Sequence, residues 1–164
     1  MLRKSCVLLG LAALTLIFIC TPVQAQQNRP IQIAIVTPAQ IFPEEDPISG
    51  IRLNLIYGRN VSVTGLDLGL INHTTTGKSM GIQFGIIGLV DSDFVGWQDN
   101  WVNVTKGRFE GFQWGAVNYS TDTRGFQLGL VNYAQTMNGL QIGIVNIIRQ
   151  GGAFPVFPIV NWSF

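Results

Sequence analysis

The chain has 164 residues, a formal net charge of +1, and a composition that is 47% hydrophobic and only 12% charged. Its length suits a single domain, and its nearly neutral charge, without a basic stripe, argues against nucleic acid as a partner. Soluble domains carry about a quarter charged residues. Either both faces of the structure are therefore buried, or part of its outside contacts something other than water.

Residues 1–25 have the organisation of a secretory signal peptide. Arg3 and Lys4 form a basic start, an uncharged and mostly apolar run covers 6–20, and Ala25 ends a small-residue cleavage pattern. Cleavage there would leave a single domain over 26–164, with eight of the ten basic residues against nine acidic ones. It would also remove Cys6 and Cys20. An exported domain without disulfides must be held together by its sheet.

Two strands are expected before the middle of the chain. Residues 31–36 and 51–57 both alternate apolar and polar side chains, which predicts half-buried strands. The stretch 38–47 between them contains three prolines and an acidic run, and it reads as a loop because proline cannot donate to a sheet. Residues 58–60 form a turn, and 61–63 lead into a repeated segment.

The rest of the chain is organised by a repeated eight-residue unit. It is clearest in Gly125-Phe-Gln-Leu-Gly-Leu-Val-Asn132, and copies start at residues 65, 81, 96, 111, 125 and 139. A fixed short period predicts an array of one structural unit. The residues expected to define the unit are Gly65, Gly81, Gly111, Gly125, Gly139, Gln83, Gln113, Gln127, Gln141, Asn72, Asn118, Asn132 and Asn146.

Each unit predicts a strand with two unlike faces. Positions 2, 4 and 6 are apolar, whereas positions 1, 3 and 5 are Gly, Gln and Gly, and a period of two is that of a β-strand. The glycines leave room for close approach of a neighbouring backbone. The alternation breaks before the Asn, which predicts a bend near Val131-Asn132. Polar linkers such as 120–124 and 134–138 are expected to be turns. Asp67 is expected to occupy the place that Gln holds in other copies.

The chain ends in a segment that is typical of a closing strand. Residues 155–164 finish on Phe164, with Val160 and Trp162 at alternate positions before it. This ending resembles the last strand of outer-membrane β-barrels of Gram-negative bacteria, so Trp162 and Phe164 are candidate signals for the barrel-assembly machinery. Pro155 and Pro158 depart from that pattern, since prolines remove hydrogen bonds from a strand.

Residues 31–164 also resemble a family of bacterial surface-repeat proteins. The resemblance rests on the tandem Gly-x-Gln-x-Gly-x-x-Asn units after a signal peptide and on the ending from Pro155 to Trp162. It implies a cell-surface or outer-membrane setting in diderm bacteria. It implies no biochemical activity.

Two all-β folds are compatible with the repeat. The first is an antiparallel sheet closed into a small outer-membrane-type barrel of roughly 8–10 strands, with positions 2, 4 and 6 facing lipid. The second is a β-solenoid with 14–16 residues per coil, in which Gln and Asn form ladders and the apolar positions form a continuous core. The signal peptide and Phe164 favour the barrel. The constant spacing favours the solenoid, although residues such as 120–124 offer little to line a second wall.

No catalytic arrangement is evident in the sequence. His73, the single histidine, follows a repeat Asn and is expected to be a solvated turn residue. Asp91, Asp93 and Asp99 are candidates for a cation site, but solvated loop carboxylates are the favoured interpretation. We expect no enzyme, no metal and no cofactor.

The favoured function is therefore that of a structural or adhesive protein of the cell envelope, exported and associated with outer-membrane lipid. The alternative is a secreted or periplasmic solenoid binding module that uses exposed Trp97, Trp101 and Trp114.

Overall fold

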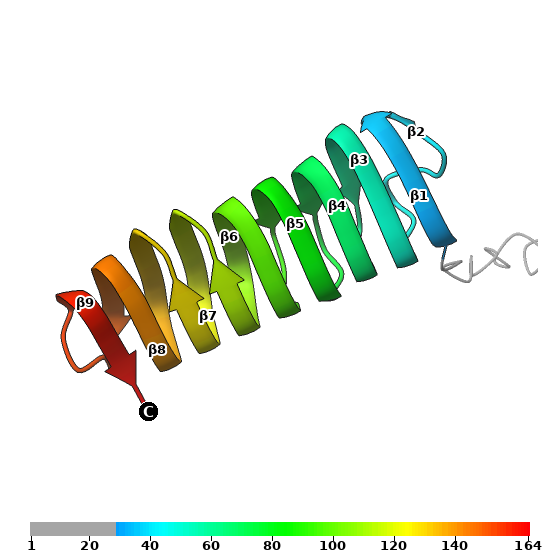
Figure 1. Ribbon diagram of the computed structural model, residues 1–164. Helices are drawn as coiled ribbons and strands as arrows, with labels where there is room; N and C mark the ends of the chain where they lie inside the picture. Colours follow the sequence, from blue (N-terminus) through cyan, green and yellow to red (C-terminus); the bar gives the residue numbers. More distant parts are fainter. Residues whose placement is uncertain (1–28) are drawn as a thin grey trace, which may run out of the picture.

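The computed structural model describes residues 29–164, so the predicted signal peptide lies outside the described residues. The described part contains strands and connecting turns. The strands are β1 (Arg29–Val36), β2 (Ala39–Gln40), β3 (Ile48–Asn60), β4 (Val63–Thr74), β5 (Ser79–Val90), β6 (Phe94–Trp114), β7 (Val117–Leu128), β8 (Val131–Gln150) and β9 (Val156–Ser163). They wind into a β-solenoid, with β1 at one end of the rod and β9 at the other (Figure 1).

The predicted outer-membrane-type barrel is wrong. Bacterial barrels of that kind close an antiparallel sheet, whereas this sheet runs from β2 at one end to β9 at the other, and every pairing from β1–β3 to β7–β8 is parallel. Antiparallel pairing is confined to the two ends. Each repeat position lies on the same position of the next coil, as Gly111 lies on Gly125 and Gly125 on Gly139. The solenoid alternative is the fold.

The interior differs from the one expected for a solenoid. Positions 3 and 8 of the repeat point inward, so that Gln127 and Asn132 are buried, while Phe126 and Leu130 at positions 2 and 6 are more than half exposed. The apolar positions therefore do not form the core. This reversal is possible because stacked, identical amides can satisfy one another's hydrogen bonds inside the coil.

The Gln side chains form one continuous ladder along the axis. Each Nε2 donates to the Oε1 of the preceding coil: Gln98 to Gln83 at 3.0 Å, Gln113 to Gln98 at 2.8 Å, Gln127 to Gln113 at 2.7 Å and Gln141 to Gln127 at 2.7 Å. Gln83 donates in turn to the carboxylate of Asp67 at 2.9 Å. Asp67 does occupy the place of a Gln, and its negative charge lies where the amide donors of the ladder point.

The buried charge of Asp67 is balanced by Arg52 in the preceding coil. Arg52 Nε and one terminal nitrogen donate to the two carboxylate oxygens at 2.7 and 2.8 Å, and the side chains are 0% and 4% exposed. The other terminal nitrogen of Arg52 donates to Asn60 Oδ1 and to the His73 carbonyl. The pair is fully bonded, which a buried ion pair requires to offset the cost of desolvation.

The Asn side chains form a second ladder, which also bonds the backbone of the neighbouring coil. Asn103, Asn118 and Asn132 each donate to the side-chain oxygen of the Asn one coil later, at 2.8 Å. The same Nδ2 groups donate to the backbone carbonyl of position 4 in the next coil, such as Leu128 for Asn118. The chain bends directly after that carbonyl, at Gly129-Leu130 rather than at the predicted Val131-Asn132. Asn satisfies a buried carbonyl beside the bend.

Two departures from the repeat compensate each other across neighbouring coils. Gly88 stands where other copies have Asn, and Asn100 stands where they have Gly. The Nδ2 of Asn100 fills the space beside Gly88, 2.5 Å from where a Cβ of Gly88 would lie, and donates to Asn103 Oδ1 at 2.7 Å. The amide thus moves to another position of the repeat, and it joins the ladder that starts at Asn103.

The linkers predicted as turns at 120–124 and 134–138 are strand residues in β7 and β8. They line the remaining interior wall with small polar and apolar side chains: Ser120 and Thr123 are hydrogen-bonded to each other, and Ala134 and Met137 pack on Ile148. In the middle of the rod, Val90, Phe94 and Phe109 form a small apolar cluster. The second interior wall therefore does not need to be apolar, and the polar residues 120–124 can line it.

Both ends of the solenoid are capped. At the first coil, Gln32 Nε2 donates to the Phe42 carbonyl and Gln32 Oε1 accepts from the Phe42 amide, so the loop after β2 covers the end of the interior. At the last coil, β9 runs antiparallel to β8 and places Asn161 opposite Gln141. Pro158 removes a donor from the outermost strand, and Pro155 directly precedes that strand, which hinders further strand addition there.

Candidate binding surface

Three columns of side chains cover the outside of the solenoid and are almost entirely apolar. We call them the outer columns; they contain positions 2, 4 and 6 of each coil, which stack in register. Their more exposed members include Ile51, Leu55, Leu70, Ile82, Ile86, Trp97, Trp101, Trp114, Phe126, Leu130, Ile142 and Ile144. Exposed apolar patches on this scale are rare on monomeric soluble proteins and mark interaction sites.

Most charged residues lie on the side of the rod away from the outer columns. In the sequence they fall between the Asn of one repeat unit and the first Gly of the next. Arg108 pairs with Asp122, and Lys106 pairs with Asp91 across neighbouring coils. Asp99 is the single charged residue in the outer columns. The rod is therefore amphipathic around its axis, with ion pairs on one side and apolar rows on the other.

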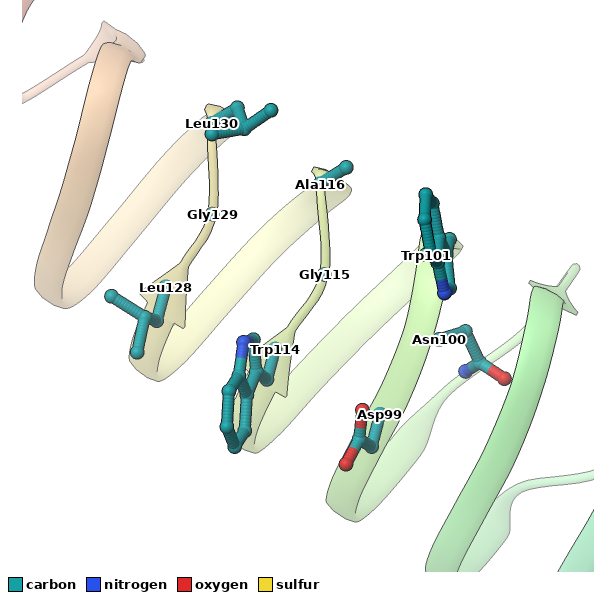
Figure 2. Close-up of a pocket in the computed structure, with 9 residues that line it drawn as sticks. All are labelled: Asp99, Asn100, Trp101, Trp114, Gly115, Ala116, Leu128, Gly129 and Leu130. Atoms are coloured by element: carbon teal, nitrogen blue, oxygen red, sulfur yellow. The ribbon is translucent and has the colours of Figure 1, made fainter.

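A shallow hollow of about 640 Å³ lies within the outer columns (Figure 2). One wall is formed by position 4, with Asp99, Trp114 and Leu128, and the other by position 6, with Trp101, Ala116 and Leu130. Asn100, Gly115 and Gly129 at position 5 form the floor between them. Because the floor residues at 115 and 129 lack side chains, the hollow is open along the rod axis.

A second hollow of about 390 Å³ occurs at the same repeat positions near the first coils. Its walls are Ile33, Leu53 and Leu68 on one side and Ile35 and Leu55 on the other, with Ala34, Asn54 and Gly69 below them. The hollow is thus a property of the repeat. The copy near the middle of the rod differs from it by carrying two tryptophans and one carboxylate.

Aromatic side chains form a short row beside the larger hollow. The Trp97 ring lies 5.8 Å from the Phe84 ring and 6.0 Å from the Phe112 ring, both in tilted arrangements. The predicted exposure of Trp97, Trp101 and Trp114 is confirmed, since they are 37%, 71% and 51% exposed. Indole groups that combine apolar area with one donor suit a binding surface.

His73 is not the solvated turn residue that the sequence indicated. It lies in β4, where Nδ1 is 2.8 Å from the Tyr57 hydroxyl and Nε2 is 2.8 Å from Asp91. Burial raises the pKa of Tyr57, so its phenol stays protonated where it is hydrogen-bonded to the imidazole. A phenol with a raised pKa is a poor nucleophile. This chain of contacts joins three coils and gives no support to catalysis.

We expect this contact chain to add stability that depends on pH. Burial acts to raise the pKa of Asp91, but hydrogen bonds from Lys106 and His73 outweigh it and hold the pKa below the ordinary 3.8. A carboxylate with a lowered pKa stabilises the fold above the unfolded-state pKa and loses that effect as the pH falls through the folded-state value. The side chain is partly exposed, so its contribution is less than about 1 kcal/mol.

The measurement is the melting temperature of the wild type and of Asp91→Asn between pH 7 and pH 2. The wild type should melt higher at pH 7, and the gap should close well below pH 3.8. A gap that stays constant across the whole range would contradict this assignment.

The acidic residues considered as a cation site do not come together. Asp91 contacts His73 and Lys106, Asp93 accepts from the Arg108 amide, and Asp99 lies in the outer columns. Within residues 29–164, no group of three or more His, Cys, Asp or Glu residues could hold a metal ion. The sequence indicated Trp101 and Trp114 as exposed binding residues, but it did not place Asp99 beside them. The signal that could have done so was the loss of the repeat pattern in the unit that starts at Gly96.

Comparisons with protein-family models, with curated proteins and with solved structures found no match. In the part of the chain that the structure describes, there is no helix of the length and apolar character needed to cross a membrane. Fold and surface chemistry are therefore the basis on which a function can be argued.

Proposed function

We propose that this protein is an exported, non-enzymatic binding module that uses the outer columns to bind an apolar or amphiphilic partner of the cell envelope. The observation that carries the proposal is the reversed polarity of the solenoid. Amide ladders occupy the interior, and Ile, Leu, Phe and Trp occupy the outside. Since apolar area in water is unfavourable by about 25 cal/mol per Å², such a surface is best explained by a partner that covers it.

The backbone of this surface suits an apolar environment. Along the rod, the strands pair with coils on both sides, so the backbone donors and acceptors of the middle coils are satisfied within the sheet. Apolar surroundings require that satisfaction, because water is not present to replace a missing hydrogen bond. The predicted signal peptide and the resemblance to surface-repeat proteins support a cell-surface or outer-membrane location.

A pair of charge substitutions tests the proposal. Leu130→Lys with Ile144→Lys places two charges on exposed outer positions and should leave the interior ladders intact. We expect the wild type to sediment with the envelope fraction of the producing bacterium, and the variant to be released into the soluble fraction with an unchanged circular dichroism spectrum.

The matched control is Gln135→Lys with Asn138→Lys, which adds the same charge on the polar side, at two exposed positions of β8. This control should stay with the envelope. Equal distribution of wild type and both variants in the soluble fraction would overturn the proposal.

A further inference from the structure

Asp99 is a charged residue in surroundings that are otherwise almost entirely apolar. It is the one charged residue among the outer columns and lies half-buried in the wall of the larger hollow. Among the described residues, the ion pairs involve Glu44, Asp46, Asp67, Asp91 and Asp122, and Asp99 has no ion-pair or side-chain hydrogen-bond partner. A carboxylate on an apolar wall is unfavourable unless a positive group pairs with it.

The neighbours of Asp99 strengthen the case for a positive ligand. Trp114 follows it on the same wall one coil later, and Trp101 lies on the opposite wall (Figure 2). Indole rings attract cations through the negative potential of their faces, and they are the best of the aromatic side chains at doing so. One carboxylate with two tryptophans is a setting for an organic ammonium group.

The remainder of the hollow is apolar and favours a ligand with a hydrocarbon chain. Beyond the tryptophans the walls are Leu128 and Leu130, and the floor is Gly115 and Gly129. These two coils extend about 10 Å along the axis at the usual strand spacing. A ligand that fills the hollow must carry an apolar chain next to its cation.

We propose that this hollow binds a single-chain amphiphile with an ammonium head group at Asp99 and its hydrocarbon tail along Leu128 and Leu130. The inference rests on the proposed function and names the ligand class for one site within the outer columns.

Other occupants fit the site less well. A divalent metal ion needs several oxygen ligands, and Asp99 is the one carboxylate that lines this hollow. A second copy packed through its own outer columns would bring no Lys or Arg to Asp99, because those columns contain none. An anionic amphiphile would be repelled.

The test is calorimetric titration of the mature protein with three twelve-carbon amphiphiles, each below its micellar concentration: dodecyltrimethylammonium, dodecyl maltoside and dodecanoate. We expect the ammonium compound to bind most tightly. Asp99→Asn should weaken the binding of the ammonium compound up to about fivefold, the effect of one partly exposed charge pair, and should leave the affinity for dodecyl maltoside unchanged. Added salt should weaken the binding of the ammonium compound and of neither other amphiphile.

The matched control is Glu110→Gln, which removes an exposed carboxylate from the same strand on the polar side and should change no affinity. Trp101→Ala should weaken the binding of both the ammonium compound and dodecyl maltoside. If Asp99→Asn and the wild type bind all three amphiphiles equally, the ammonium site is refuted and the broader binding function stands. If the wild type binds none of the three, this inference is refuted, and the envelope fractionation decides the proposed function separately.

Discussion

Arg52→Gln should destabilise the solenoid by about 3–5 kcal/mol, because it leaves the carboxylate of Asp67 buried without its counter-ion. In the wild type both side chains are inaccessible and joined by two hydrogen bonds. The variant keeps one strong donor to Asp67, the amide of Gln83. The free energy of unfolding in urea, followed by circular dichroism, measures the loss.

The double variant Arg52→Gln with Asp67→Gln should recover most of that stability. Position 52 pairs with Gln32 on one side and with position 67 on the other, and position 67 pairs with Gln83. Two new glutamines would thus extend the amide ladder to the first coil. Arg108→Gln, which breaks an ion pair at the surface, should cost much less stability than Arg52→Gln. A double variant as unstable as the single one would show that the ladder cannot replace the ion pair.

Gly129→Val should cost at least about 3 kcal/mol, because the coil has no space for a side chain at this position. A Cβ on Gly129 would lie 2.2 Å from the Gly115 carbonyl oxygen and 2.6 Å from the Asn118 side-chain nitrogen. Neither neighbour can move freely, since the Gly115 backbone is hydrogen-bonded to the next coil and Asn118 belongs to the Asn ladder. Relief would require separating two coils.

Gly151→Val is the comparison, since this glycine lies outside the ladders. A Cβ there meets nothing nearer than Ser163 Oγ at 3.8 Å, but the residue has a φ of +76°. We expect a cost of about 1–2 kcal/mol from the left-handed backbone alone. Thermal unfolding of the two purified variants gives the ranking, and equal stability would refute the close-approach argument for Gly129.

The ending of the chain takes a different role from the one expected of a barrel. Trp162 lies in β9 against Phe154, with the two rings 6.3 Å apart, and Phe164 is 89% exposed beyond the strand. A barrel-assembly signal in these residues depended on a closed antiparallel sheet. In the solenoid, the segment from Val156 to Ser163 covers the last coil, and its proline, Pro158, suits an outermost strand.

The repeat alone determined much of this protein. Its period of 14–16 residues and its alternation of Gly-Gln-Gly with apolar side chains predicted an all-β array whose equivalent residues behave alike. The place of Asp67 in the Gln column followed from the same alignment. Contacts between unrelated positions did not follow from it, such as those among Tyr57, His73 and Asp91 or between Asn100 and the space beside Gly88.

The tertiary structure alone decided which face of the strand is inside. Alternation of side chains distinguishes two faces but does not say which one is buried, and hydrophobicity by itself favoured burying the Leu and Phe face. Parallel stacking changes that balance, because it brings each Gln and Asn next to an identical amide that satisfies its hydrogen bonds. Where the stacked amides fill the interior, the apolar side chains of positions 2, 4 and 6 lie outside, and there they form the surface on which the proposed function is based.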